Sequence, residues 1–321
     1  MSVNGSAVVL GGTGFVGRHT CRALSAQGFD VWAVARGAPP PGEAGRFLAF
    51  DVALRPPEDL AKVLDELRPE VVVNAVGSIW GRTDDEMWDT VTVPTLRLLD
   101  ALALLATPPR IVHLGSVLEY GRMDVGTTAS PATVERPGSA YGRAKLAATR
   151  AVMERLRSHR LRGVVLRITN LAGPLSPDVS LLGRVANQLW AAAGEPAVVE
   201  LDPLLAHRDF VDVRDVADAV VAAATSPVTG ELINIGSGTS TSVRVLVDLL
   251  VARSGLAAGV VERTGTGIQH STEDWSRVDI EPAERLLGWR PRRPLTDAVD
   301  AFWQEFVARH HQPNGTENPP T

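Results

Sequence analysis

The glycine-rich stretch Gly11-Gly12-Thr13-Gly14-Phe15-Val16-Gly17 decides the fold of this chain. It follows an apolar run and precedes a segment with helical spacing of apolar residues. Its first glycine permits a tight turn, its third lets the backbone approach a pyrophosphate, and its last allows close helix–strand packing. The helix N-terminus then offers free N–H groups to phosphate, so we predict a dinucleotide site; a glycine-rich turn without a ligand is the alternative. The residues expected to contact the dinucleotide here are Gly11, Thr13, Gly14, Phe15, Val16 and Gly17.

Around this stretch, short apolar runs alternate with longer amphipathic ones. β-branched runs such as Val71-Val72-Val73 suit strands that are covered on both faces. The alternation, with right-handed crossovers, predicts an α/β fold with a doubly wound parallel sheet. Strands are expected at Ser6–Leu10, Asp30–Ala35, Arg46–Phe50, Glu70–Val76, Arg110–Leu114 and Gly163–Ile168, and helices at Gly14–Gln27, Pro57–Leu67, Asp84–Ala106 and Ala140–Ser158.

The pattern becomes irregular after Ile168, where prolines interrupt it. We therefore predict a dinucleotide-binding domain over residues 1–168, to which residues 209–238 return. Residues 169–310 are expected to form mostly a smaller substrate-binding region, and residues 311–321 a flexible tail. Later helices are expected at Val213–Thr225, Ser242–Arg253 and Leu295–Arg309, and a strand at Glu231–Ile235.

The amino-acid composition argues against several classes of function. The 321 residues include 45% hydrophobic and 21% charged residues, an ordinary globular mix, and the net charge of −5 gives no indication of nucleic-acid binding. The single cysteine, Cys21, excludes an internal disulfide and a multi-cysteine metal cluster, and no metal is expected. No apolar run approaches the roughly 18 residues of a membrane span, and no signal peptide is visible. We expect a cytoplasmic protein with no membrane partner.

The end of the second predicted strand bears on the cofactor. Many dinucleotide sites carry an acid there for the ribose 2′-hydroxyl, but this strand ends in Arg36 and the next acid is Glu43. An arginine can pair with a 2′-phosphate, which favours NADP(H) over NAD(H); a solvated Arg36 is the alternative. Asp51, followed by Val52, comes after the third predicted strand and could accept from the adenine amino group or cap a turn.

Tyr141 and Lys145 stand four residues apart in a predicted helix, which puts both side chains on one face. A free tyrosine has a pKa of about 10, and a nearby ammonium lowers that pKa. The pair therefore predicts a tuned general acid–base, with a packed Tyr and a solvated Lys as the alternative. Ser116 follows the strand Arg110–Leu114 at the carboxyl edge where such sheets bind ligands, and its hydroxyl can polarise a substrate carbonyl.

These residues resemble the extended short-chain dehydrogenase/reductase family, the group of Rossmann-fold sugar-nucleotide epimerases, dehydratases and reductases. The resemblance covers nearly the whole chain. Beyond the glycine stretch and the Tyr–Lys pair, the segments that carry it are Ser116 before Tyr120-Gly121, Leu166–Asn170, His207–Val211, Asn234–Gly238 and Leu287–Pro291.

The resemblance implies roles for individual residues. It makes Ser116, Tyr141 and Lys145 catalytic and places Asn170 and Arg208 at the nucleotide diphosphate of the substrate. A salt bridge of Arg208 with Asp209 or Asp212 is the alternative for that arginine. The residues that it places along the nicotinamide ribose are Asn74, Ala75, Val76 and Gly77.

The chain departs from the family at two places. The dehydratase branch carries an Asp-Glu pair directly after the catalytic hydroxyl residue, where this chain has Val117 and Leu118, so sugar 4,6-dehydration is not expected. Glu119 comes one position too late and is interpreted as structural. The family also commonly has an asparagine where this chain has Val91, which puts the usual proton relay in doubt.

Within the family, segments around Ser116, Tyr141 and 206–217 are similar to 4-ketoreductases of deoxysugar biosynthesis in antibiotic-producing bacteria, which act on dTDP-4-keto-6-deoxyhexoses. We therefore expect NADPH-dependent reduction of a nucleotide-linked 4-keto-6-deoxy sugar by a homodimer. The alternatives are a 4-epimerase, a non-catalytic NADP(H)-binding regulator and a reductase of non-sugar ketones. The sugar is expected to be selected by loops 79–82, 174–183 and 201–207.

Overall fold

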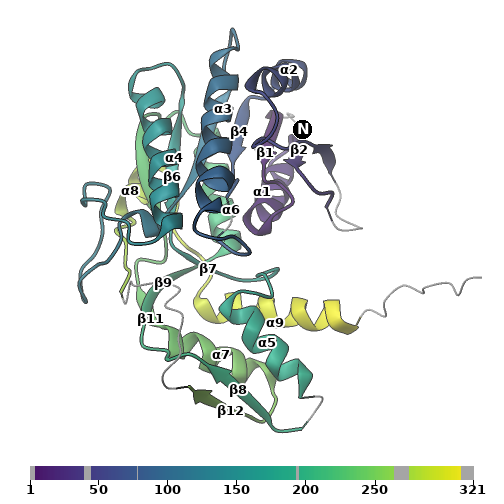
Figure 1. The fold of residues 1–321 in the computed structure, drawn as a ribbon, viewed down its shortest axis with the longest axis vertical. Coiled ribbons are helices and arrows are strands. Elements are labelled where there is room, and N and C mark those ends of the chain that lie inside the picture. The colour runs from purple at the N-terminus through teal and green to yellow at the C-terminus, as the bar shows by residue number, and fades with distance from the viewer. Residues whose placement is uncertain (1–3, 40–44, 78, 193–194, 264–274, 312–321) are drawn as a thin grey trace, which may run out of the picture.

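Seven parallel strands form the central sheet of the computed structural model, which describes residues 4–39, 45–77, 79–192, 195–263 and 275–311 (Figure 1). In spatial order the strands are β3 (Arg46–Ala49), β2 (Phe29–Ala35), β1 (Asn4–Leu10), β4 (Val71–Asn74), β5 (Arg110–Ser116), β6 (Gly163–Ile168) and β10 (Glu231–Ile235). The predicted doubly wound α/β fold is confirmed. The strand order reverses between β1 and β4, and ligands bind at such a switch point.

Helices cover both faces of this sheet (Figure 1). On one face lie α1 (Phe15–Ala26), α6 (Val213–Thr225) and α8 (Glu281–Leu287), and on the other α2 (Pro57–Leu67), α3 (Val93–Ala103) and α4 (Ala140–Arg157). Successive β1 residues alternate between them: Val9 packs toward α1 and α6, whereas Val8 packs toward α2 and α3. Both valines are fully buried, which explains why the strands are apolar without a polar face.

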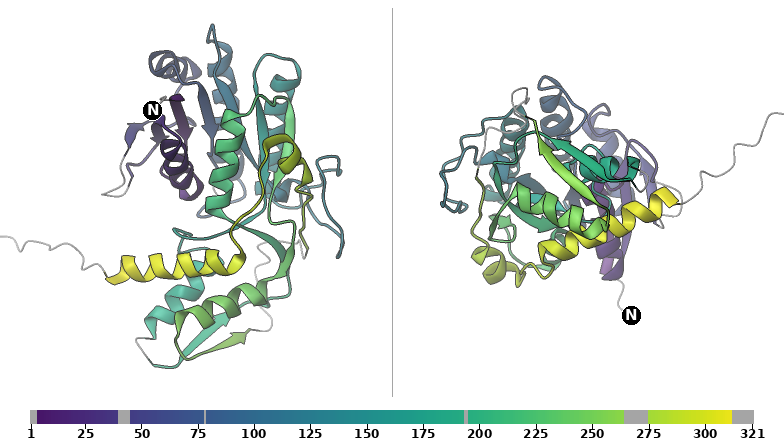
Figure 2. Two further views of the ribbon diagram at one scale, coloured as in Figure 1. Left: turned by 180° about the vertical axis from the view of Figure 1, so that it is seen from behind. Right: turned by 90° about the horizontal axis from the view of Figure 1, so that it is seen from below.

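A smaller lobe lies beyond one end of the sheet (Figure 2). It contains α5 (Leu181–Ala191), α7 (Val243–Ser254), α9 (Leu295–His311) and the parallel pair β8 (Ala197–Leu201) and β12 (Ala258–Glu262). Leu189, Val199 and Phe302 are fully buried in its own apolar core. A three-stranded sheet of β7 (Asn170–Ala172), β9 (His207–Asp212) and β11 (Ser240–Ser242) joins it to the main sheet, since β7 follows directly on the carboxyl end of β6.

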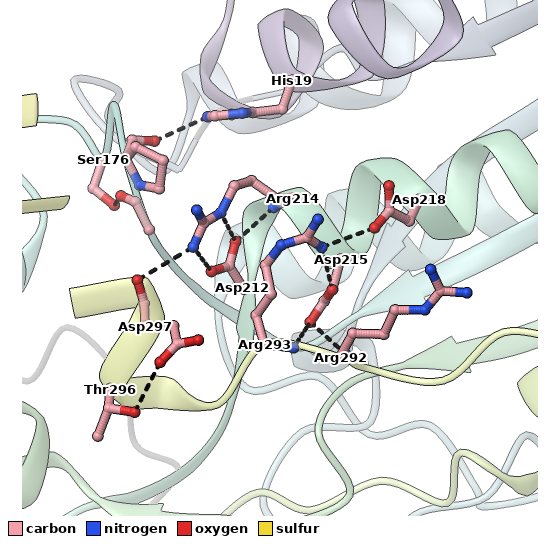
Figure 3. Close-up of polar contacts among 12 residues, drawn as sticks. His19, Ser176, Asp212, Arg214, Asp215, Asp218, Arg292, Arg293, Thr296 and Asp297 are labelled. Atoms are coloured by element: carbon pink, nitrogen blue, oxygen red, sulfur yellow. Dashed lines mark hydrogen bonds and ion pairs between the residues drawn. The ribbon is translucent and has the colours of Figure 1, made fainter. Parts of the chain in front are cut away.

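Buried ion pairs fasten the chain where α6 meets the segment before α9 (Figure 3). The carboxylate of Asp215 pairs with Arg293 and also accepts from the backbone N–H of Arg292 at 3.0 Å. Asp212 pairs with Arg214 at 2.6 Å, and Arg214 also donates to the backbone oxygen of Asp297. Asp212, Arg214 and Asp215 belong to α6 and its N-cap, whereas their partners Arg292, Arg293 and Asp297 lie at or just before the start of α9, so these contacts hold α6 and the start of α9 together.

One expectation about helices needs correction. The single helix expected over Asp84–Ala106 is wrong: Trp88–Thr92 form a π-helical turn, η1, and α3 begins only at Val93 and ends at Ala103. Pro94 gives the reason, because proline has no N–H for the regular bond to the carbonyl four residues earlier. The short elements β7, α5, β8, β9, β11, β12 and α8 were not predicted. Of the expected tail, residues 312–321 lie outside the described ranges.

Among the described residues, no helix combines the length and apolarity needed to cross a membrane.

Candidate active site

A cavity of about 430 Å³ opens where β1, β2 and β4 end. Its wall includes the glycine loop, the residues after β2 and β3, the segment after β4, and Tyr141 from α4. The predicted site residues that line it are Gly11, Thr13, Gly14, Phe15, Val16, Gly17, Arg36, Asp51, Val52, Ala75, Val76, Gly77 and Tyr141. The cavity therefore brings together residues that are up to 130 positions apart, at the switch point of the sheet.

The glycine loop has the shape that a dinucleotide phosphate needs. Gly11 adopts a φ of +77°, which an L side chain rarely tolerates, and a Cβ on Gly17 would lie 2.0 Å from the backbone oxygen of Gly11. Gly14 is the N-cap of α1 and offers no side-chain acceptor to the first N–H groups of the helix. These groups point at the cavity with the positive end of the helix dipole, so the residues fit an anionic dinucleotide.

Arg36 and Asp51 line the cavity just after β2 and β3. Arg36 is exposed, and it makes no hydrogen bond or ion pair within the described part of the chain, so its guanidinium is available to an anion. Asp51 lines the cavity and also accepts from the N–H of Ala53 at 2.8 Å. Both interpretations of Asp51, a turn cap and a cavity residue, are thus compatible with its geometry.

Tyr141 and Lys145 occupy one face of α4, whose N-cap Ser139 accepts from the N–H of Gly142 at 3.1 Å. Tyr141 reaches the cavity, whereas Lys145 is only 4% exposed. The Lys145 ammonium donates to the backbone oxygen of Leu114 at 2.9 Å and to that of Val76 at 3.2 Å. It therefore ties α4 to the carboxyl ends of the neighbouring strands β5 and β4.

The expected effect of Lys145 on Tyr141 needs correction. Burial raises the pKa of Tyr141 above its ordinary value, and the Glu119 carboxylate raises it further. Burial also lowers the pKa of Lys145 to about 8, so its charge is itself disfavoured. The tyrosine hydroxyl is thus protonated near neutral pH, which is the form that can give up a proton.

Ser116 is the last residue of β5 and the N-cap of the 3₁₀ turn η2 (Val117–Glu119). Its Oγ accepts from the N–H of Leu118 at 3.2 Å, and its own N–H donates to Glu119 Oε1 at 2.7 Å. The capping bond uses Oγ as an acceptor and leaves the hydroxyl proton for donation. Ser116 is not among the residues that line the cavity, although the strand that carries it also supplies the Leu114 oxygen to Lys145.

Asn74 differs from its expected placement. Its side chain is buried and donates to Thr95 Oγ1 at 3.0 Å, lies 3.1 Å from His113 Nδ1, and accepts from the N–H of Val76. The amide therefore points into the protein, where it shapes the segment that lines the cavity instead of contacting a ligand there.

The two predicted diphosphate contacts also lie off the cavity wall. Asn170 Nδ2 donates to Ser276 Oγ at 3.4 Å, and buried Arg208 donates to the backbone oxygen of His207 at 3.2 Å. Asp209 accepts from the N–H groups of Ser237, Gly238 and Val278. Asp212 pairs with Arg214, so each of the two acids near Arg208 has other partners.

Several wall residues were not predicted as site residues. Leu171 and Pro177 follow β6, while Ile79, Trp80 and Arg82 follow β4, within or beside the loops expected to select the sugar. Thr90 reaches the cavity from the π-helical turn η1, which a regular helical pattern could not reveal. π turns are frequent at functional sites, and Pro94 was the one sequence signal for this turn.

Comparison with known proteins assigns the family. The family model described as "NAD dependent epimerase/dehydratase family" matches residues 7–236. The chain belongs to this family. It is 44% identical over 92% of its length to the dTDP-6-deoxy-L-talose 4-dehydrogenase (NAD(P)(+)) of Kitasatospora kifunensis, with 93% of that protein covered. It is 25% identical over 96% of its length to a UDP-glucose 4-epimerase of Rhizobium meliloti, with 98% covered.

Solved structures agree on the fold. The UDP-glucose 4-epimerase of Thermotoga maritima with UDP-glucose superposes with a TM-score of 0.83 at 23% identity, covering 95% of this chain and 100% of that one. MoeE5 in complex with UDP-glucuronic acid and NAD superposes with a TM-score of 0.81 at 24% identity, covering 95% and 99%. The match to the family model and the relative of 44% identity confirm the resemblance to the extended short-chain dehydrogenase/reductase family.

Proposed function

We propose that this protein reduces the C4 ketone of a dTDP-linked 4-keto-6-deoxyhexose with NADPH. The observation that carries the proposal is the position of Tyr141, a protonated phenol on the wall of the cavity that also contains the glycine loop. A ketone bound beside Tyr141 has a proton donor within the site where the dinucleotide fits. The relative named as a dTDP-6-deoxy-L-talose 4-dehydrogenase supports both the nucleotide and the carbon that reacts.

The chain's own residues supply the proton and the orientation. A reduced nicotinamide cofactor, which the glycine loop and residues 75–77 would hold, would supply the hydride for the ketone carbon. Tyr141 donates its hydroxyl proton to the oxygen as negative charge develops there, and Ser116 donates a hydrogen bond to the same oxygen. Lys145, one helical turn along α4, provides a cation that stabilises the tyrosinate left after proton transfer.

NADPH is the proposed cofactor because of Arg36. Its exposed guanidinium stands at the end of β2, on the cavity wall, without a partner in the described ranges. An arginine in this place suits a 2′-phosphate through charge-assisted hydrogen bonds. The relative named above carries the description NAD(P)(+), which includes this cofactor.

The proposal also covers the residues that contact the substrate, the oligomeric state of the protein and its location. Asn170 and Arg208, near the join between the lobes, are proposed to approach the diphosphate once substrate is bound. We also propose a cytoplasmic homodimer that pairs through the α3 and α4 helices. Residues 1–168 with 209–238 would form the dinucleotide-binding part, and residues 169–310 most of the substrate-binding part.

A substrate panel tests the proposal. The purified chain is incubated with dTDP- and UDP-linked 4-keto-6-deoxyhexoses and with NADPH or NADH, and cofactor absorbance and product stereochemistry by NMR are followed. Stoichiometric NADPH oxidation with a dTDP-sugar is the expected result. Interconversion of two C4 epimers without net cofactor use would indicate a 4-epimerase, as in the relatives with that name. Cofactor binding without turnover of any sugar in the panel would indicate a regulator.

A further inference from the structure

Glu119 is buried beside the proposed catalytic residues, and the mechanism above does not use it. Its side chain has no exposed surface, and Oε1 accepts from the N–H of Ser116 at 2.7 Å and from Thr149 Oγ1 at 3.0 Å. A Cβ on Gly115 would lie 2.7 Å from the same oxygen. Gly115 has no side chain, and the Glu119 carboxylate occupies the space that a side chain there would need, against the end of β5.

One oxygen of Glu119 therefore joins two elements. Ser116 ends β5, while Thr149 stands on α4 one turn after Lys145 and two turns after Tyr141, on the same face. A shift of α4 along its axis relative to β5 would lengthen the Thr149 bond. The carboxylate fixes the helix and the strand in one register.

The second oxygen of Glu119 is held from the other side. Oε2 accepts from Arg167 Nε at 2.8 Å, and Arg167 also pairs with Glu135 at 2.8 Å. The guanidinium carbon of Arg167 lies 4.3 Å from the centre of the Tyr120 ring. With both oxygens bonded, the carboxylate has a single orientation.

Stability alone is a poor explanation for this arrangement. Desolvation of a buried ion pair can exceed its Coulombic gain, and apolar residues of similar volume often hold a core equally well. What an apolar residue cannot do is accept simultaneously from Ser116 and Thr149. Glu119, which was expected to be structural, is therefore bonded to the strand end that carries Ser116 and to the helix that carries Tyr141 and Lys145.

We propose that Glu119 is a positioning residue, which holds the Ser116 hydroxyl and the Tyr141 hydroxyl in register for the same substrate oxygen. This inference rests on the proposed function, because it takes those two hydroxyls as the groups that contact the ketone. The negative charge of Glu119 also adds to the rise that burial causes in the pKa of Tyr141, and it opposes the fall that burial causes in the pKa of Lys145.

The Thr149 bond can be removed without disturbing the ion pair. Thr149→Val keeps the side-chain shape and deletes the donor, and Thr149→Ser keeps the donor. We expect kcat to fall roughly tenfold in T149V, because a small displacement of α4 relative to β5 misplaces the reacting groups. KM for NADPH should stay within about twofold, and T149S should restore kcat. Thr20→Val is the matched control, because Thr20 is fully buried and its hydroxyl has no partner among the described residues.

The charge of Glu119 is tested separately and without substrate. The chain has two lysines, Lys62 and Lys145, so ¹³C-lysine NMR gives two titrating signals, and Lys62 on the surface is the internal reference. Glu119→Gln should lower the pKa of Lys145 further, because the carboxylate that raises this pKa is lost. If E119Q does not fold, the same titration in T149V and wild type reports whether the carboxylate still faces the helix, since rotation away from α4 also lowers the pKa of Lys145.

Each result decides for or against the inference. Wild-type kcat in T149V, equal losses in T149S and T149V, or an unchanged Lys145 pKa in E119Q would each overturn the role of Glu119. These outcomes are distinct from failure of the proposed function, for which Tyr141→Phe would retain turnover. An inactive Y141F together with a fully active T149V therefore rejects Glu119 alone.

Discussion

The Lys145 ammonium donates to the backbone oxygen of Leu114 at 2.9 Å, beneath the active site. A second bond to Val76 places the same cation across the gap between β5 and β4, which are neighbours in the sheet. Lys145 therefore has a structural as well as an electrostatic place in the site. It holds the cavity-lining segment after β4 against the helix that carries Tyr141.

Lys145 should titrate far below an ordinary lysine. Burial lowers its pKa to about 8 from an ordinary value of 10.5, although the Glu119 carboxylate opposes that shift. ¹³C-lysine NMR of the ligand-free protein should show one signal that titrates near pH 8. The second signal comes from Lys62, whose side chain is 76% exposed. A Lys145 signal that titrates near the ordinary lysine value of 10.5 would contradict the burial of Lys145.

The same shift makes stability depend on pH. The folded protein releases the Lys145 proton near pH 8 and the unfolded chain near pH 10.5, so the unfolded chain holds more protons between these values. Linkage then requires the contribution of this group to the free energy of unfolding to increase as pH rises through that window. Lys145→Met should remove this contribution. Urea denaturation of wild type and K145M across this pH window measures the two free energies of unfolding. If both change equally with pH, the prediction is wrong.

Tyr141→Phe should separate chemistry from binding. The substitution removes the proton donor while the ring still fills its place on the cavity wall. We expect kcat to fall roughly 10²–10⁴-fold, the usual effect of losing a positioned acid, with the Kd for NADPH nearly unchanged. Steady-state kinetics and a fluorescence titration with NADPH give the two quantities. Tyr120→Phe, which removes a buried hydroxyl bonded to Asn234, controls for loss of a tyrosine elsewhere.

The cofactor half of the site could be predicted from sequence because its geometry is local. The glycine loop, Arg36 and the Tyr141–Lys145 spacing each lie within a few residues of a strand or helix end, and the cavity contains the loop, Arg36 and Tyr141. Glu119 bonds only to protein groups among the described residues, as its structural interpretation requires, and the positioning role proposed above goes beyond that interpretation.

The features that could not be predicted from the sequence depend on long-range packing. The raised pKa of Tyr141 follows from how deeply α4 is buried, and the carbonyl partners of Lys145 come from strands 31 and 69 residues away. Asn74 faces inward because His113 and Thr95 offer it partners from β5 and α3. The smaller lobe escaped detection because short strands such as β8 find their partner in a segment some 60 residues later.

Gly17→Ala should distort the glycine loop of the proposed dinucleotide site. The new Cβ would lie 2.0 Å from the Gly11 backbone oxygen, and a backbone atom cannot move aside as a side-chain tip can. We expect the free energy of unfolding to fall by about 1–3 kcal/mol, as for other overpacked sites, and NADPH binding to weaken with it. Urea denaturation and calorimetry measure both effects. Gly259→Ala is the control, since a Cβ there meets no atom within 4 Å.

Arg36→Ala should change which cofactor the protein prefers. If the guanidinium pairs with a 2′-phosphate, its loss should raise KM for NADPH roughly tenfold to a hundredfold and leave KM for NADH within about twofold, because NADH lacks that phosphate. Arg46→Ala is the matched control: Arg46 is also an exposed arginine on the neighbouring strand, but it pairs with Asp30 at 2.9 Å and does not line the cavity. Equal increases of both KM values in R36A would mean that Arg36 contacts a part common to the two cofactors. In that case the preference for NADPH would have no basis in this residue.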